Sequence, residues 1–162
     1  MKFNILTLVF FLTLFLNTFG NDTLSNILTV GNNKFSLDYA ELANESYGIH
    51  SKFEVDLVNQ HNNLTTAKTY VYFSLTGSNT GHLSDGIYHF SSATLSERLP
   101  HQFSGALKIN NHNVEITGGT IVIETRKSDF GIQFILKLKN GDIAKGIYGG
   151  KVVKSDRSKA YH

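Results

Sequence analysis

The chain of 162 residues contains no cysteine, no tryptophan and only one proline. Without cysteine it can form no disulfide, offers no thiolate to a metal or a substrate, and has no lipobox for attachment of a lipid. The domain must therefore be held together by its apolar core alone. A domain of about 150 residues buries roughly 68–70% of the surface of its unfolded chain, which is enough for that purpose.

Charge is also scarce, and neither sign dominates. The chain has 15 Lys and Arg against 13 Asp and Glu, and a formal net charge of +2. Removing residues 1–20 takes away Lys2 and no acidic residue, which lowers the net charge by one. A balance so close to zero gives no electrostatic basis for binding nucleic acid or an anionic membrane. We expect no nucleic-acid partner.

A single long apolar run occurs, and it lies at the N-terminus. Lys2 precedes residues 3–16, which are almost entirely Ile, Leu, Val and Phe, and Thr18-Phe19-Gly20 closes the segment. The run is shorter than the ~20 residues that a membrane-spanning helix needs. This is the layout of a cleaved signal peptide. We therefore expect a signal peptide at residues 1–20, a periplasmic or extracellular protein, and no membrane span.

Alternation of apolar and polar residues dominates the rest of the chain. In the longest example the alternate positions from Phe130 to Leu138 are all apolar, with Gln133 and Lys137 between them. A period of two over nine residues predicts a strand with one face on a core and the other in water. Such strands are expected at 27–30, 34–39, 51–58, 69–75, 86–91, 103–109, 120–127, 129–139 and 142–153, with an optional one at 113–117.

Turn residues separate these strands. Asn140-Gly141 predicts a type I′ hairpin turn, with positive φ at both residues, and Gly31-Asn32-Asn33 predicts another tight turn. Residues 76–85 form a polar loop. Asp38 to Ser46 is the one candidate for a helix.

The pattern predicts an all-β fold: a single antiparallel domain of about eight or nine strands, over residues 21–153, followed by a polar C-terminal tail at 154–162. Short connections and the glycines Gly146, Gly149 and Gly150 in the last strand favour a closed or strongly curved barrel, with a β-sandwich as the alternative. Closure would remove the sheet edges that invite aggregation.

Four segments carry a resemblance to a known family. Their sequences are Thr29–Leu37 (TVGNNKFSL), Ser84–Phe90 (SDGIYHF), Gly118–Ile123 (GGTIVI) and Asn140–Gly150 (NGDIAKGIYGG). They resemble the hairpins of small exported calycin-like, or lipocalin-like, β-barrel proteins common in Bacteroidota, mostly of unknown function. The resemblance covers residues 27–153 and implies a barrel, but it brings no catalytic residues. Many members are lipoproteins, from which this chain differs by lacking the lipobox cysteine.

Histidines and carboxylates are the first candidates for chemistry. His82, Asp85, His89 and His101 lie within twenty residues and could supply metal ligands, but no pair has a diagnostic metal-binding spacing. Scattered surface histidines are the favoured interpretation, and neither a metal site nor a cofactor is predicted. Glu54 and Asp56 share one strand face about 7 Å apart, and that face is expected to be solvated. Without burial neither would become a catalytic acid.

Nucleophiles and phosphate-binding loops are not indicated. The chain has no thiol and no Gly-x-Ser-x-Gly motif, and Gly77-Ser78-Asn79-Thr80-Gly81 precedes a predicted strand rather than a helix.

Tyr70 and Tyr72 are the remaining candidates. They alternate with Val71, Phe73 and Leu75, so both should lie on the outer face of their strand. Two neighbouring outward tyrosines would form a flat amphipathic surface suited to a sugar or a partner chain. Ordinary strand propensity, with the rings packed under a loop, is the simpler explanation.

The sequence therefore predicts an exported, non-catalytic β-barrel domain with a binding or structural role. It would act as a monomer toward a small molecule, a glycan or a protein. The first alternative is a lipocalin-like carrier of a small apolar ligand, since an eight-stranded barrel can hold one. The second is an enzyme or metal binder that uses His89 or His101 with Asp85.

Overall fold

The computed structural model describes residues 26–59, 67–126 and 129–158. The predicted signal peptide lies outside them. These residues form 12 β-strands and one short 3₁₀ helix, and none of the helices they form is long and apolar enough to cross a membrane. The all-β class is confirmed, but the strands number 12 rather than eight or nine.

The bounds of the elements follow the predicted strands in most places. They are β1 (Ile27–Val30), β2 (Asn33–Ser36), β3 (Tyr39–Asn44), β4 (Lys52–Val58), β5 (Tyr70–Thr76), β6 (Gly86–Phe90), η1 (Leu95–Glu97), β7 (Gln102–Ile109), β8 (His112–Val114), β9 (Ile116–Arg126), β10 (Asp129–Leu138), β11 (Ile143–Gly150) and β12 (Val153–Asp156).

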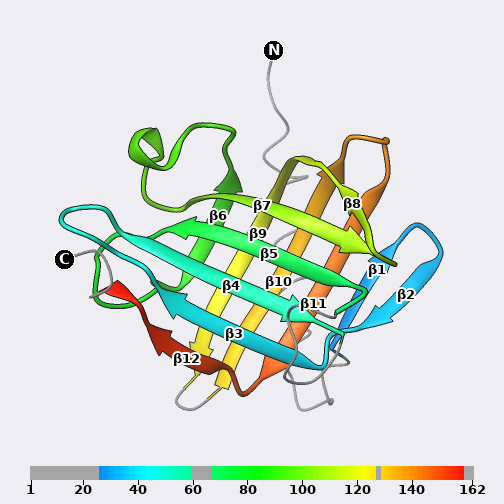
Figure 1. Ribbon diagram of the computed structural model, residues 1–162, viewed down its shortest axis with the longest axis horizontal. Coiled ribbons are helices and arrows are strands. Elements are labelled where there is room, and N and C mark those ends of the chain that lie inside the picture. Colours follow the sequence, from blue (N-terminus) through cyan, green and yellow to red (C-terminus); the bar gives the residue numbers. More distant parts are fainter. Residues whose placement is uncertain (1–25, 60–66, 127–128, 159–162) are drawn as a thin grey trace, which may run out of the picture.

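All twelve strands belong to one sheet, which curls into a half-barrel (Figure 1). The strand order is β12-β3-β4-β5-β7-β6-β9-β10-β11-β1-β2, with β8 paired to β7. Two neighbouring pairs, β3–β12 and β6–β7, are parallel, so the expectation of a purely antiparallel sheet was wrong. Within the described residues β2 and β12 remain as edges, so of the two predicted forms, a closed barrel or a strongly curved one, the structure has the strongly curved form.

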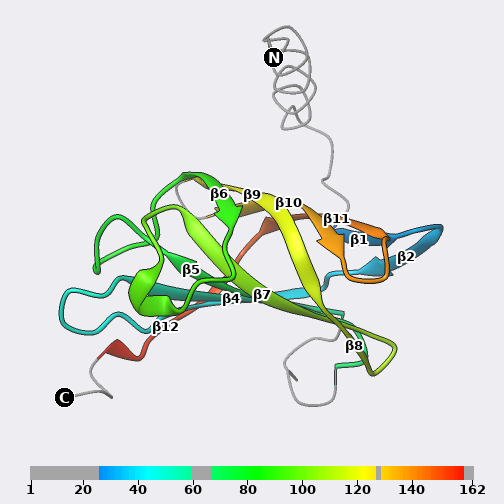
Figure 2. The same ribbon diagram turned by 90° about the horizontal axis from the view of Figure 1, so that it is seen from above.

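The half-barrel brings two layers of the sheet face to face. Strands β3, β4, β5 and β7 run across β9, β10 and β11 in Figure 1, and Figure 2 shows β6, β9, β10 and β11 above β4 and β7. The apolar positions of the alternating runs fill the space between the layers, as predicted. Its fully buried side chains include Phe53, Phe73, Phe103, Phe130, Leu57, Leu75, Leu107, Ile121 and Ile123.

The chain passes between the layers at two short connections, and these account for the errors in the predicted strands. Leu37 and Asp38 separate β2 from β3, so the predicted strand 34–39 is broken there. The helix considered for residues 38–46 is instead β3, an antiparallel partner of β4. Residues 151 and 152 likewise separate β11 from β12, and the segment expected as a tail from Lys154 begins inside β12.

The type I′ turn occurs at a different pair of residues from the one predicted. Asn110 and Asn111, between β7 and β8, both have positive φ, 50° and 68°, and Ile109 pairs with His112 across them. At the Asn140-Gly141 hairpin only Gly141 has positive φ. Its amide donates to the carbonyl of Leu138 at 3.0 Å, which is typical of a three-residue loop with a glycine bulge.

The ring of Phe134 lies in the core over Gly146, in space that a side chain at position 146 would occupy. The two residues pair across β10 and β11, and a Cβ on Gly146 would lie 1.9 Å from Phe134 Cζ. From this position the ring of Phe134 packs edge to face against Phe73 of the opposite layer, with centroids 5.2 Å apart.

The substitution Gly146→Ala should lower the free energy of unfolding by about 1–3 kcal/mol, because the ring of Phe134 would have to leave its place. Urea denaturation measures the change. Gly118→Ala is the matched control, since its Cβ would meet only the flexible side chain of Lys137 at 3.5 Å. If the two variants were equally stable, the absence of a side chain at Gly146 would not be what makes room for the ring of Phe134.

Candidate functional site

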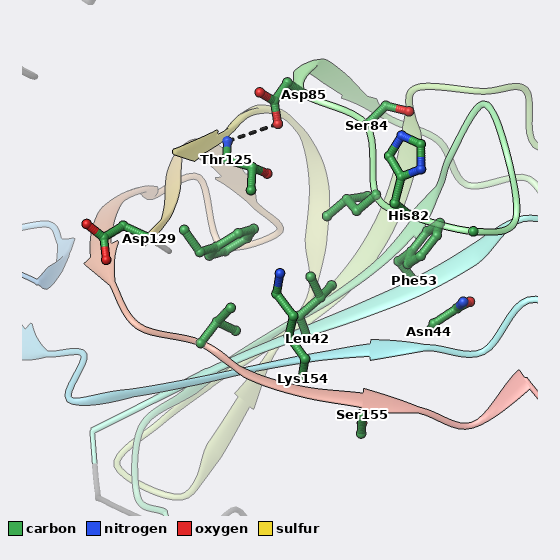
Figure 3. A pocket seen from close by; sticks show the side chains of 14 residues that line it. Leu42, Asn44, Phe53, His82, Ser84, Asp85, Thr125, Asp129, Lys154 and Ser155 are labelled. Atoms are coloured by element: carbon green, nitrogen blue, oxygen red, sulfur yellow. Dashed lines mark hydrogen bonds between the residues drawn. The ribbon is translucent and has the colours of Figure 1, made fainter. Parts of the chain in front are cut away.

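A cavity of about 520 Å³ lies at the end of the half-barrel where β9 ends and β10 begins (Figure 3). Its volume falls within the range of ligand-binding cavities, roughly 300–1,000 Å³. The residues around it come from β3, β4, the loop between β5 and β6, the β9–β10 hairpin and β12. They are Leu42, Asn44, Phe53, Gly81, His82, Leu83, Ser84, Asp85, Thr125, Asp129, Phe130, Val152, Lys154 and Ser155.

The floor of the cavity is apolar because it is the end of the core. Phe53 on β4 and Phe130 on β10 occupy inward positions of their alternating strands and are each 2% exposed. Leu42 on β3 is half-buried and packs against the same core. Strand alternation therefore places aromatic and aliphatic surface at the bottom of the cavity without any dedicated motif.

The loop between β5 and β6 forms one polar side of the rim. The side-chain oxygen of Asn79 accepts hydrogen bonds from the backbone amides of Gly81 and His82, each at 3.0 Å. The Asn44 side-chain amide donates to the carbonyl of Thr80 at 3.0 Å. These bonds tie the loop to β3 across the cavity, so the rim is a defined structure rather than a loose connection.

Asp85 and Lys154 supply charge at opposite sides of the rim. Asp85 Oδ1 accepts a hydrogen bond from the backbone amide of Thr125 at 2.9 Å, which fixes the carboxylate at the end of β9. Lys154 belongs to β12, and its amino group points into the cavity in Figure 3. The cavity can therefore hold an apolar body on its floor and a polar or charged group at its mouth.

Tyr88 supports this rim from below. It is fully buried, and its hydroxyl donates to the carbonyl of Ser84 at 2.8 Å. Burial and the charge of Asp85 raise the pKa of Tyr88 to about 12, so the hydroxyl remains a donor at all physiological pH values.

The structure separates the four residues considered as metal ligands. His82 and Asp85 both line the cavity. His89 is exposed on β6, and the ring of His101 packs on the ring of Tyr88 with centroids 4.8 Å apart. Across residues 26–59, 67–126 and 129–158, no three His, Cys, Asp or Glu residues form a group that could hold a metal ion.

Tyr70 and Tyr72 lie on the outer face of β5, and both are half-buried rather than fully exposed. Their rings lie side by side, with centroids 6.4 Å apart and planes inclined by 20°. The hydroxyl of Tyr72 donates to Glu54 at 2.5 Å, and that of Tyr70 bonds to Asp56. Hydrogen bonds thus connect the two tyrosines to the carboxylates of β4.

The prediction of a solvated face for Glu54 and Asp56 was wrong at Asp56, which is 6% exposed. Burial, together with the charges of Glu54 and Glu41, raises the pKa of Asp56 to about 6, despite the hydrogen bond from Tyr70. Burial and the adjacent carboxylates also raise the pKa values of Tyr70 and Tyr72. The polar positions of β4 are therefore a half-buried network.

Four carboxylates make up this outer acid cluster: Glu41, Glu45, Glu54 and Asp56. Lys52 Nζ lies 2.6 Å from Glu45 and 2.8 Å from Glu54. Arg157, just beyond β12, lies 2.6 Å from Glu41 and 3.2 Å from Glu45. The hydrogen bonds that Lys52 donates to Glu45 and Glu54 outweigh burial and raise its pKa. Two cations thus pair with three of the four acids, Glu41, Glu45 and Glu54, on the outer face.

No protein-family model, no curated protein and no solved structure matches this chain. The resemblance to calycin-like barrel proteins therefore stays a prediction.

Replacing Asp56 by Asn should stabilise the protein at neutral pH. The folded-state pKa of about 6 lies above the ordinary value near 3.9, so the ionised carboxylate costs stability above pH 6, and that cost is absent below pH 4. A shift of two units corresponds to roughly 3 kcal/mol. We expect Asp56→Asn to raise the free energy of unfolding by about 1–3 kcal/mol at pH 7.5 and to leave it nearly unchanged at pH 4.

Urea denaturation at the two pH values measures this effect. Asp38→Asn is the control, because Asp38 is exposed and its carboxylate accepts a hydrogen bond from the hydroxyl of Ser36 at 3.1 Å. If Asp56→Asn changed the free energy of unfolding by the same amount at both pH values, ionisation of Asp56 would not be what destabilises the folded protein.

Proposed function

We propose that this is an exported, non-catalytic binding protein that holds one small amphipathic molecule in the cavity at the end of the half-barrel. The observation that carries the proposal is the cavity itself, with an apolar floor and a polar rim. Phe53 and Phe130 would contact the apolar part of the ligand, and Asp85 and Lys154 would face its polar part. This combines the predicted binding role with the alternative of a small-ligand carrier.

The geometry around His82 and Asp85 supports binding rather than catalysis. A histidine acting as a general base is normally oriented by a hydrogen bond to a carboxylate. Here the ring of His82 lies 3.5 Å from the Asn79 side-chain amide, while Asp85 accepts from the backbone of Thr125. Each of the two is engaged with a different structural partner on the rim.

A surface role for Tyr70 and Tyr72 is the second candidate. The near-parallel rings offer a flat face, as a sugar or a partner chain would need. Their hydroxyls are already occupied by Asp56 and Glu54, which leaves only the partly buried ring faces for contact. The cavity offers more enclosed surface and is therefore preferred.

Filling the cavity should abolish binding of an apolar probe. Phenylnaphthylamine, a neutral dye that fluoresces when it leaves water, should bind the parent protein at one site. Val152→Trp places an indole in the cavity and should weaken binding at least about tenfold, as expected when a ligand and a side chain compete for one enclosed volume.

Val153→Trp is the matched control. Val153 is the next residue, is 51% exposed and does not line the cavity, so its replacement should leave dye binding unchanged. Equal binding by the two variants, or no binding by the parent protein, would refute the proposal. Native mass spectrometry of protein from its own source then identifies the bound molecule.

Export has its own test. The mature protein recovered from outside the cytoplasm should begin at Asn21, because Gly20 occupies the −1 position of the predicted cleavage site. Intact-mass measurement of the recovered chain gives the answer, and a chain that keeps residues 1–20 would contradict it.

A further inference from the structure

One wall of the cavity is a short edge strand. Residues 152–157, called the strap here, comprise β12 and one residue at either end. Lys154 lies opposite Leu42 in the parallel ladder with β3, and both residues line the cavity. Strand β12 has four residues and pairs with β3 alone, so only one ladder of backbone hydrogen bonds holds it in the sheet.

The strap presents two different sides. Val152, Lys154 and Ser155 all line the cavity, but the side chains of Ser155 and Arg157 contact the outer acid cluster. Ser155 Oγ donates to Glu41 at 3.1 Å, and the backbone amide of Arg157 donates to the carbonyl of Asn44 at 2.8 Å. Figure 3 shows the side chain of Ser155 directed away from the cavity that Lys154 enters. Contacts on the outer face therefore set the position of the inner wall.

Arg157 is the main charged anchor of the strap. Its two terminal nitrogens reach Glu41 at 2.6 Å and Glu45 at 3.2 Å, and Glu54 lies 3.9 Å away. These carboxylates belong to β3, to the residue after it, and to β4. A planar guanidinium can bond to several carboxylates at once, which a lysine cannot do with the same geometry.

We propose that the strap opens and closes the cavity, and that Arg157 is the positioning residue that holds it closed by pairing with the outer acid cluster. This inference rests on the proposed function, since it concerns access to the same cavity. When Arg157 leaves the cluster, β12 can separate from β3, and Val152 and Lys154 move away from the ligand. The pairing of Arg157 with the outer acid cluster thereby regulates how long the ligand stays in the cavity.

The anchor depends on pH through the acids. Several titratable or charged groups face Arg157 or its partners: Glu41, Glu45, Glu54, Asp56, Lys52, Tyr39, Tyr70 and Tyr72. The hydrogen bonds that Arg157 donates to Glu45 and Glu41 outweigh burial and raise the pKa of Arg157, so it stays charged. Burial opposes ionisation of Glu45, but Lys52 and Arg157 lower its pKa overall.

The direction of the pH effect follows from these groups. The lowered pKa of Glu45 means that its pairing is complete at neutral pH and is lost on acidification. Ionisation of Asp56 near pH 6 adds a further negative charge opposite Arg157. The strap should thus be held most firmly at neutral pH, loosen as the pH falls through about 6 and Asp56 is protonated, and loosen further when acidification protonates Glu45, whose pKa is lowered.

Two measurements on the full mature chain test the inference. The first is the release rate of phenylnaphthylamine on dilution, and the second is hydrogen exchange of the peptide that contains β12, each at pH 7.5 and pH 4. In the parent protein both rates should rise about tenfold at pH 4, the scale expected for loss of charge-assisted hydrogen bonds. Arg157→Ala should show the fast rates at both pH values, and Arg157→Lys should restore part of the pH dependence.

Lys139→Ala is the control for lost charge. Lys139 forms an exposed ion pair with Glu115 at 2.6 Å, far from the strap in the sheet, and its removal should change neither rate. If Arg157→Ala behaved like Lys139→Ala at both pH values, Arg157 would not position the strap.

A disulfide provides a second test that leaves Arg157 in place. Ala43 and Ser155 are register partners on β3 and β12, and the chain has no cysteine of its own. Oxidised Ala43→Cys/Ser155→Cys should release dye slowly at both pH values, and the same protein after reduction should regain fast release at pH 4. Equal release from the oxidised and reduced forms would overturn the inference.

The two proposals can fail separately. If the parent protein binds no dye, the proposed function falls, but hydrogen exchange still reports on the strap. Exchange of the β12 peptide that changes neither with pH nor with Arg157→Ala would refute the anchor even if dye binding were confirmed.

Discussion

The contact between the two layers of the sheet is the constraint on which the other features depend. Phe134 lies over Gly146 in its own layer and packs its ring against Phe73 in the other. Phe73 in turn packs edge to face with Phe103, and Phe103 with Phe90. This chain of rings sets the separation of the layers, and it leaves the far end, around Phe53 and Phe130, open as a cavity. Because the chain has no cysteine, no disulfide strengthens this contact.

The sequence was sufficient for the strands and their inward faces, because a period of two is a local property. The alternation from Phe130 to Leu138 correctly placed every second residue in the core. It could not show the two crossings between the layers, at residues 37–38 and 151–152, since each is only two residues long and interrupts no obvious pattern. The parallel pairing of β12 with β3 depends on both crossings and was missed for that reason.

The candidate site was harder to predict, because burial on an outer face depends on what covers it. Alternation correctly placed Glu54, Asp56, Tyr70 and Tyr72 outside the core, but Asp56 is buried among side chains of the neighbouring strands, which include Glu41 on β3 and Tyr70 on β5. His82, Asp85, His89 and His101 were considered because they are close in the sequence; His82 and Asp85 line one cavity, whereas His89 and His101 do not. The sequence did not reveal the apolar floor of the cavity, because Phe53 and Phe130 occupy the same kind of inward position as the other core residues of their strands.

The single backbone neighbour of β12 has a consequence for solubility. While β12 is in place, its amides and carbonyls satisfy one side of β3, and the exposed border of the sheet is only four residues long. Displacement of β12 would uncover Glu41–Asn44 and leave the whole of the six-residue β3 as the edge, a longer template to which a strand from another molecule could add. Glu41 lies within that stretch, and a concentration of like charge there would oppose self-association. The acids that pair with Arg157 would then also oppose the addition of strands from other molecules to the exposed edge of β3.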